Sequence, residues 1–101
     1  MKIKHALEMD SPQIWKYETD QKDGVCVIAK EPMVIKFTFE FYGDKFFDVL
    51  EIEQLIDEML KEPVSVEGAA QELGDIFKDY EVTASGRSAG HGWITSIQQP
   101  I

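Results

Sequence analysis

The 101-residue chain has a single cysteine, Cys26, and no hydrophobic run long enough to cross a membrane. One cysteine excludes an intramolecular disulfide, a CxxC redox motif and a thiolate zinc cluster. Because Cys26 lies in the apolar run 25–28, we expect a buried thiol and not a nucleophile. The N-terminal residues MKIKHALEMD have no apolar run behind their two lysines, so the sequence predicts no secretory signal and a cytoplasmic protein.

Sequence patterns for phosphate and calcium binding are also lacking. The chain contains no G-x-x-x-x-G-K-S/T loop and no D-x-D-x-D-G loop. We therefore expect neither a metal nor a cofactor, and we assign no catalytic residue. The function expected from these absences is non-enzymatic.

Positive charge is scarce in the middle of the chain, where the formal net charge of −9 originates. Residues 1–39 hold six lysines and six acidic residues, whereas residues 40–81 hold thirteen acidic residues and three lysines. The last twenty residues contain one charged side chain, Arg87. Because an acidic surface repels phosphates, we expect no direct binding to nucleic acid.

Hydrophobic residues make up 44% of the chain and aromatic residues 11%, which indicates one folded domain over residues 1–101. Alternating apolar residues predict four strands, at 2–9, 14–18, 25–30 and 33–41. The polar residues 19–24 are typical of a hairpin loop. Short connections of this kind predict an antiparallel meander with one face open to solvent.

Two amphipathic helices are predicted next. Asp48, followed three residues later by Glu51, resembles an N-cap with its capping box, and Pro63 ends this helix. Ser65 caps a second helix that continues to about Tyr80. Glycine at position 74 costs about 1 kcal/mol relative to alanine in a helix, so we expect a neighbouring element to approach it closely. The apolar stripes comprise Val49, Ile52, Leu55, Ile56, Met59 and Leu60 in the first helix, and Val66, Ala69, Ala70, Leu73, Ile76, Phe77 and Tyr80 in the second.

Strands at 81–85 and 92–98 close the chain as a hairpin. The predicted fold class is α+β: an antiparallel sheet, built from the four-strand meander and the C-terminal hairpin, with two helices packed on one face. The segment SGRSAGHGWITSI, residues 85–97, gathers glycines, hydroxyls, an arginine, a histidine and a tryptophan. In this architecture it forms the final hairpin.

The exposed faces of the two helices carry the most unusual charge pattern in the chain. Like charges spaced three or four residues apart cost a few tenths of a kcal/mol per pair, yet few lysines are interleaved. One interpretation is a solvated face, and the other is a surface that docks a strongly basic protein, such as the nucleic-acid-binding groove of a nuclease or toxin. The candidate partner-binding residues are Glu51, Glu53, Asp57, Glu58, Glu72, Asp75 and Asp79, with Arg87, His91 and Trp93 from the final hairpin.

Two further hypotheses remain open. Ser85, Arg87 and His91 suggest a small ligand-binding or enzymatic domain, in which His91 acts as a general base and Arg87 holds an anion. The second hypothesis is self-association through the open sheet face or the last strand. In size, charge and lack of motifs, the chain resembles the small acidic inhibitors that bacteria and phages use against nucleases, such as toxin-immunity, anti-restriction and anti-CRISPR proteins. This resemblance is one of composition, and it implies an inhibitor without assigning a role to any residue.

Overall fold

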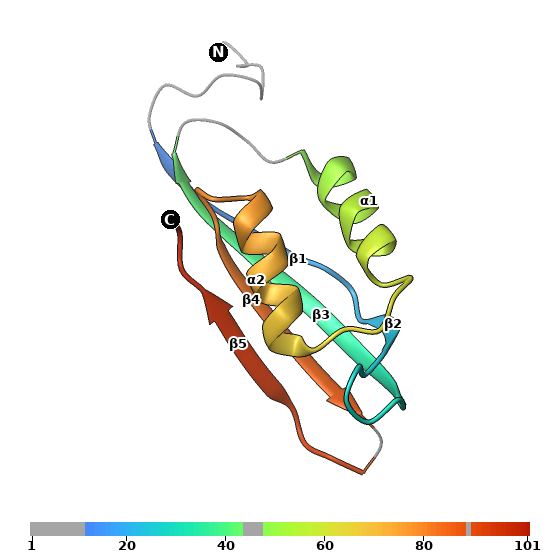
Figure 1. Ribbon diagram of the computed structural model, residues 1–101. Helices are drawn as coiled ribbons and strands as arrows, with labels where there is room; N and C mark the ends of the chain where they lie inside the picture. Colours follow the sequence, from blue (N-terminus) through green and yellow to red (C-terminus); the bar gives the residue numbers. More distant parts are fainter. Residues whose placement is uncertain (1–11, 44–47, 89) are drawn as a thin grey trace.

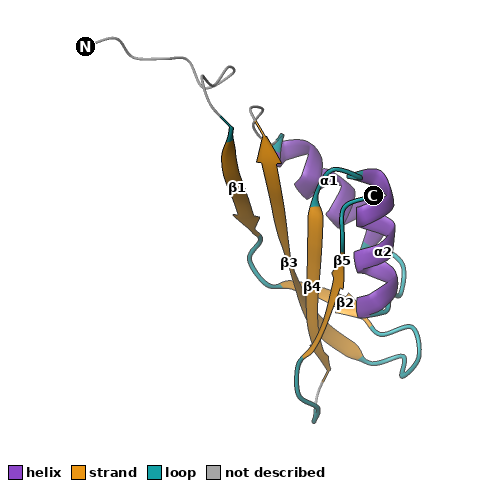
Figure 2. Ribbon diagram, turned by 90° about the vertical axis from the view of Figure 1, so that its left-hand side faces the viewer, coloured by secondary structure: helices purple, strands orange, loops and turns teal. Residues whose placement is uncertain are grey.

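The computed structural model describes residues 12–43, 48–88 and 90–101, so the first predicted strand, 2–9, lies outside the described residues. The protein has two layers, a single antiparallel sheet and a pair of helices that lie on one of its faces (Figures 1 and 2). The predicted α+β class is confirmed. The elements are β1 (Gln13–Glu18), β2 (Lys22–Val25), β3 (Pro32–Gly43), α1 (Val49–Met59), α2 (Val66–Ile76), β4 (Glu81–Ser88) and β5 (Ile94–Gln98).

The sheet has the strand order β1-β3-β4-β5, and β2 also pairs with β3. β1 and β2 therefore lie end to end along the same edge of the long strand β3, and the predicted hairpin loop at 19–24 is wrong. Glu18 pairs with Thr38 and Lys22 pairs with Ile35. The chain between these two pairs is therefore one residue longer on the β1–β2 side than on β3, which is the signature of a β-bulge.

Thr19 explains why the chain continues along β3 at the bulge. Its amide N–H donates to the Phe37 carbonyl over 2.9 Å, and its hydroxyl oxygen accepts the Phe37 N–H over 3.1 Å. The side chain is only 4% exposed, and its hydroxyl also donates to the Asp20 carbonyl over 2.9 Å. A threonine hydroxyl thus satisfies the β3 amide at the position where the regular ladder is interrupted.

The predicted strand at 25–30 is also wrong beyond Val25, because the chain reverses direction there. The amide of Lys30 donates to the Cys26 carbonyl over 2.8 Å, and Lys30 has a φ of 59°. The apolar run 25–28 instead bonds to the connection between the helices: Val27 N–H donates to the Val64 carbonyl, and Val64 N–H donates to the Val25 carbonyl, each over 2.9 Å. Cys26 is half-buried beside this contact.

Both helices begin at the predicted caps. The Asp48 carboxylate accepts the Glu51 N–H over 3.1 Å, and the Ser65 hydroxyl accepts the Gly68 N–H over 2.9 Å. α2 ends earlier than predicted, at Ile76. There Phe77 leaves the helical conformation, and its ring stacks on that of Tyr80 with 5.4 Å between centroids.

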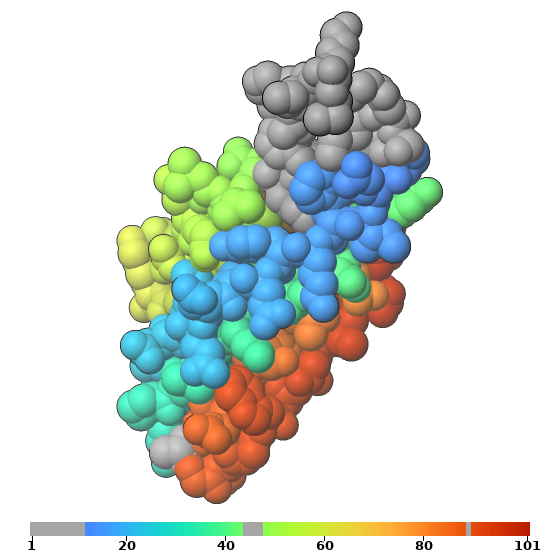
Figure 3. Space-filling model, turned by 180° about the vertical axis from the view of Figure 1, so that it is seen from behind, coloured from blue at the N-terminus to red at the C-terminus, as the bar shows by residue number. Residues whose placement is uncertain are grey.

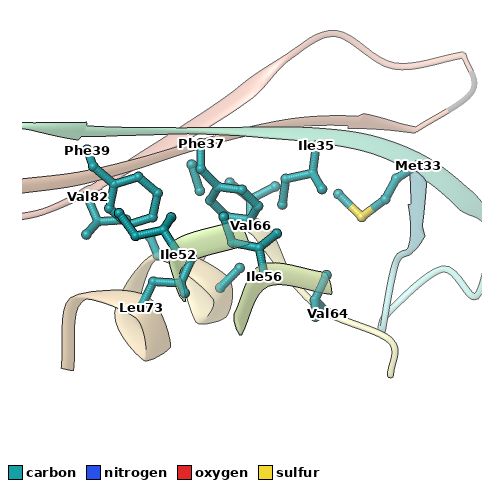
Figure 4. Packing of buried hydrophobic residues seen from close by; sticks show 13 residues of the cluster. Met33, Ile35, Phe37, Phe39, Ile52, Ile56, Val64, Val66, Leu73 and Val82 are labelled. Carbon is teal, nitrogen blue, oxygen red and sulfur yellow. The ribbon is translucent and has the colours of Figure 1, made fainter. Parts of the chain in front are cut away.

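The core lies between the sheet and the helix pair (Figure 4). Its most deeply buried residues alternate along β3, as predicted, and meet one stripe from each helix. The largest fully buried side chains are Ile35, Phe37, Phe39, Ile52, Ile56, Leu73 and Val82. Small residues bring α2 close to the sheet: Ala69 and Ala70 are buried, and a Cβ added at Gly86 would lie 2.6 Å from the Val66 Cγ2 atom.

Candidate functional site

Of the seven acidic residues predicted on the helices, six lie on α1 or α2, and Asp79 lies in the connection between α2 and β4 because α2 ends at Ile76. Six of the seven are exposed: Glu51, Asp57, Glu58, Glu72, Asp75 and Asp79. Glu53 differs because it is half-buried at the interface between α1 and the sheet edge. The helix layer thus carries a dense negative charge, but its members have different environments.

Glu53 and Asp57 have partners within the chain. The Tyr17 hydroxyl donates to Glu53 Oε2 over 2.9 Å. Lys22 Nζ lies 3.0 Å from Glu53 Oε1 and 3.1 Å from Asp57 Oδ1. These contacts connect the β1–β2 edge to α1, so both carboxylates contribute to the fold as well as to the surface charge.

Two pKa values respond to this cluster. Burial, together with the hydrogen bond to Glu53, raises the pKa of Tyr17 above its usual value. Burial by itself would lower the pKa of Lys22, but hydrogen bonds to Glu53 and Asp57 outweigh it, so the pKa of Lys22 is raised. Lys22 and Tyr17 therefore keep their protons more firmly in the folded protein.

A groove runs between the two helices. It has a volume of about 300 Å³ and is lined by apolar side chains and by exposed carboxylates. We call it the α1–α2 groove. We call its apolar lining residues the floor and its glutamates the acidic rim: the floor comprises Leu55, Met59, Pro63, Val64, Leu73 and Ile76, and the rim comprises Glu58, Glu62 and Glu72. Ile76 is 50% exposed there, which leaves a large apolar side chain open to solvent between two negatively charged helices.

The amino-acid sequence did not predict this groove. Leu55, Met59 and Ile76 belong to the predicted apolar stripes. Because each stripe is wider than the area that packs on the sheet, these three side chains are left to line the groove. Glu62 was not among the predicted site residues. The signal in the sequence that would have identified Glu62 is its position just before Pro63, at the end of the first helix and close to the second.

A second hollow, of about 510 Å³, lies between the start of α2, the turn after β2 and the β4–β5 end of the sheet. Arg87, His91 and Trp93 all line it, so the structure brings the three predicted hairpin residues together. Ser85 does not line it: its hydroxyl lies 2.9 Å from that of Thr95 in a cross-strand contact on the open sheet face. The predicted trio of Ser85, Arg87 and His91 therefore does not line one pocket.

Trp93 also contacts two cations. Lys36 Nζ lies 5.6 Å from its ring centroid and Arg87 Cζ lies 5.5 Å from it. Both distances are within the range of cation–π attraction. These contacts connect the start of β5 to β3 and β4.

No family model, curated protein or solved structure matches the chain. None of the helices in the described residues is long and apolar enough to span a membrane. Within residues 12–43, 48–88 and 90–101, no three His, Cys, Asp or Glu side chains are grouped as metal ligands would be.

Although no catalytic residue is predicted, the chain contains one sequence pattern of a catalytic class. Residues 86–90 read G-R-S-A-G and match the G-x-S-x-G pattern of α/β-hydrolases. In those enzymes the serine occupies a sharp turn between a strand and a helix. Here Ser88 ends β4 and the chain continues to β5, with His91 N–H donating to the Ser88 carbonyl over 3.2 Å. The pattern is present in the sequence, but its required strand–turn–helix context is not.

Proposed function

We propose that this protein is a non-enzymatic inhibitor that docks a basic protein partner through its helix layer. The observation that carries the proposal is the α1–α2 groove, which is lined by both apolar side chains and carboxylates. Interfaces derive most of their affinity from a few apolar or aromatic side chains that enter pockets, while surrounding charges select the partner. The groove provides both features in one place.

The charge around the groove supports a basic partner. Glu51, Glu62, Glu72, Asp75 and Asp79 form no ion pair with any other described residue. Unpaired carboxylates on one side of a molecule attract a positively charged surface over a distance set by the ionic strength. The partner chemistry that fits is a lysine- and arginine-rich segment with an apolar side chain at its centre.

A nucleic-acid-handling protein has a surface of this kind. Its binding groove is lined by cations that normally meet phosphates, and an acidic helix pair of this size occupies such a groove in place of the nucleic acid. Inhibition then follows from steric and electrostatic occlusion. The compositional resemblance to immunity, anti-restriction and anti-CRISPR proteins supports the same class of partner.

The rival hypothesis, a ligand site built on Ser85, Arg87 and His91, has less support. Ser85 lies on the open face while His91 lines the hollow, and Arg87 is engaged with Trp93. An acyl-transfer site would need a nucleophile and a base within hydrogen-bonding reach, and no such bond connects these residues in the described part of the chain.

The experiment compares two charge-reversed variants of equal net charge. Wild-type protein captures the partner from a lysate of the native host, and association and dissociation rates are then measured with the purified partner across a salt series. The first variant reverses Glu58, Glu62 and Glu72 to lysine at the groove rim. The second reverses Asp20, Asp23 and Glu31, which are exposed on β2 and on the connections before and after it, and serves as the matched control.

We expect the rim variant to slow association by about tenfold or more and the control variant to stay near the wild type. Ile76→Ser tests the apolar floor separately, and we expect it to speed dissociation while association is unchanged. Equal losses in the two charge variants would show that net charge alone drives binding. No effect in either variant would overturn the proposal.

A further inference from the structure

The two edges of the sheet are built differently. Along the β1–β2 edge, charged side chains recur at Lys16, Glu18, Asp20, Lys22 and Asp23, and the β-bulge interrupts the strand. Charges and bulges are the devices by which proteins prevent an edge strand from pairing with another chain. This edge is therefore protected against pairing.

The β5 edge has none of these devices. Its sequence, ITSIQ, contains no charge and no proline, and its strand is regular. Within the described residues β5 pairs only with β4, so its outer row of backbone N–H and C=O groups is available. The strand lies along the margin of the sheet in the views from the side and from behind (Figures 2 and 3).

Apolar side chains are concentrated on and beside this edge. Ile94 is 56% exposed, Ile97 is 53% exposed and Trp93 is 44% exposed. Thr95 and Ile97 lie on the open face, opposite Ser85 and Thr83 of β4, while Ile94 lies on the helix side. Exposed isoleucines on an unprotected strand edge are a typical feature of an interface.

The distribution of charge points to a second copy of this chain as the molecule that pairs with β5. A molecule with a net charge of −9 repels its own copy over most of its surface. Residues 82–101 contain no acidic residue, so two copies that meet at β5 bring together the parts of their chains with the least negative charge. Residues 82–101 therefore offer no Asp or Glu side chain to attract the basic partner of the helix layer, and Glu67 of α2 is the acidic residue that lines the hollow beside Ile94.

We infer that β5 pairs antiparallel with β5 of a second copy of this chain, so that the protein is a homodimer with one continuous sheet. A two-fold axis makes such a contact self-complementary, and the outer backbone groups of each strand then satisfy those of the other. The α1–α2 groove lies on the side of α2 that faces α1, and β5 lies on its other side (Figure 1). The dimer therefore presents two free grooves.

The dependence on salt concentration distinguishes dimerisation from the binding of a basic partner. The dimer joins two acidic molecules, so added salt weakens their repulsion and strengthens dimerisation. Binding of a basic partner to the helix layer instead weakens with added salt. The inference does not depend on the proposed function, and either one can fail while the other stands.

The test is sedimentation equilibrium of the purified protein over a range of concentrations, at low and at high salt. We expect a concentration-dependent dimer that tightens with salt. Ile97→Glu places a charge on the β5 edge, and we expect it to weaken dimerisation by about tenfold or more. Ile14→Glu is the matched control, because Ile14 lies on the opposite edge of the same open face and is 74% exposed.

Amide hydrogen exchange provides the second measurement. In the dimer, the outward-facing β5 amides, which do not bond to β4, should be protected at high protein concentration and should exchange faster after dilution. A wild-type monomer at the highest soluble concentration would overturn the inference, as would equal effects of the two glutamate variants. Protection of these outward-facing amides in a monomer, independent of concentration, would assign the edge to a segment of the same chain and would also overturn the inference.

Discussion

Gly74 on α2 lies directly against the side chain of Gln98 on β5. A Cβ atom added at Gly74 would overlap Gln98 Cγ and would lie 3.1 Å from Gln98 Cβ. The glycine therefore allows the helix to approach the edge strand, as expected from its unfavourable position within a helix. This contact positions the edge strand that we infer to be the dimer interface.

Replacement of Gly74 by alanine should destabilise the protein. Alanine is favoured in a helix by about 1 kcal/mol, but the overlap with Gln98 forces the helix or the strand to move, and we expect a net loss of about 1–3 kcal/mol. Urea denaturation measures the free energy of unfolding. In a Gln98→Ala background the obstacle is removed, so Gly74→Ala should be neutral or stabilising there. If Gly74→Ala stabilised the wild-type chain, the close approach would be refuted.

Replacement of Lys22 by glutamine should also reduce stability. Lys22 connects β2 to Glu53 and Asp57 on α1, and its side chain is only 20% exposed. Loss of these charge-assisted contacts should cost about 1–2 kcal/mol. Lys61→Gln is the control, because Lys61 and Glu58 form a 2.8 Å ion pair that is largely exposed, and such pairs contribute little. Equal effects of the two substitutions in urea denaturation would contradict the structural role of Lys22.

Stability should fall in alkaline solution. The pKa of Tyr17 is raised by burial and by Glu53, and the pKa of Tyr80 is raised by burial and by Asp79. The pKa of Lys22 is raised as well. A group with a raised pKa in the folded state stabilises it fully below its unfolded pKa, near 10.0 for tyrosine and 10.5 for lysine, and the contribution is lost as pH rises through the folded value.

Urea denaturation in steps from pH 8 to about 11 measures this loss, which should begin near pH 10. Tyr80→Phe removes one of the three titrations and should flatten the alkaline decline. Tyr42→Phe, at a tyrosine that is 70% exposed, is the control and should leave the decline unchanged. A stability that stays constant to pH 11 in the wild type would contradict the raised pKa values.

The local elements were largely predictable because their signals are local. Alternation along β3, the caps Asp48 and Ser65, and the helical stripes depend on residues within a few positions of one another. The errors have long-range causes. Residues 19–24 have the composition of a loop, but the hydroxyl of Thr19 bonds to Phe37 on a strand that follows much later. The apolar run 25–28 has the composition of a strand, but its backbone bonds to Val64.

The candidate site was predictable in charge but not in shape. The acidic excess of residues 40–81 is visible in the sequence, whereas the groove depends on how far apart two helices pack on the sheet. The same distinction applies to single residues. Glu53 and Glu72 look alike in the sequence, but Glu53 bonds to Tyr17 and Lys22 while Glu72 lies on the groove rim.

The amino-acid sequence by itself determined the α+β class, the two capped helices, the buried face of β3 and the sign and place of the charge. These properties follow from periodicity and composition, which act over one or two turns of helix or a few residues of strand. Only the tertiary structure decided which carboxylates are paired, where the apolar floor of the groove lies and which sheet edge is protected. Those properties depend on contacts between segments far apart in the chain, and the free energy of packing the whole domain selects them.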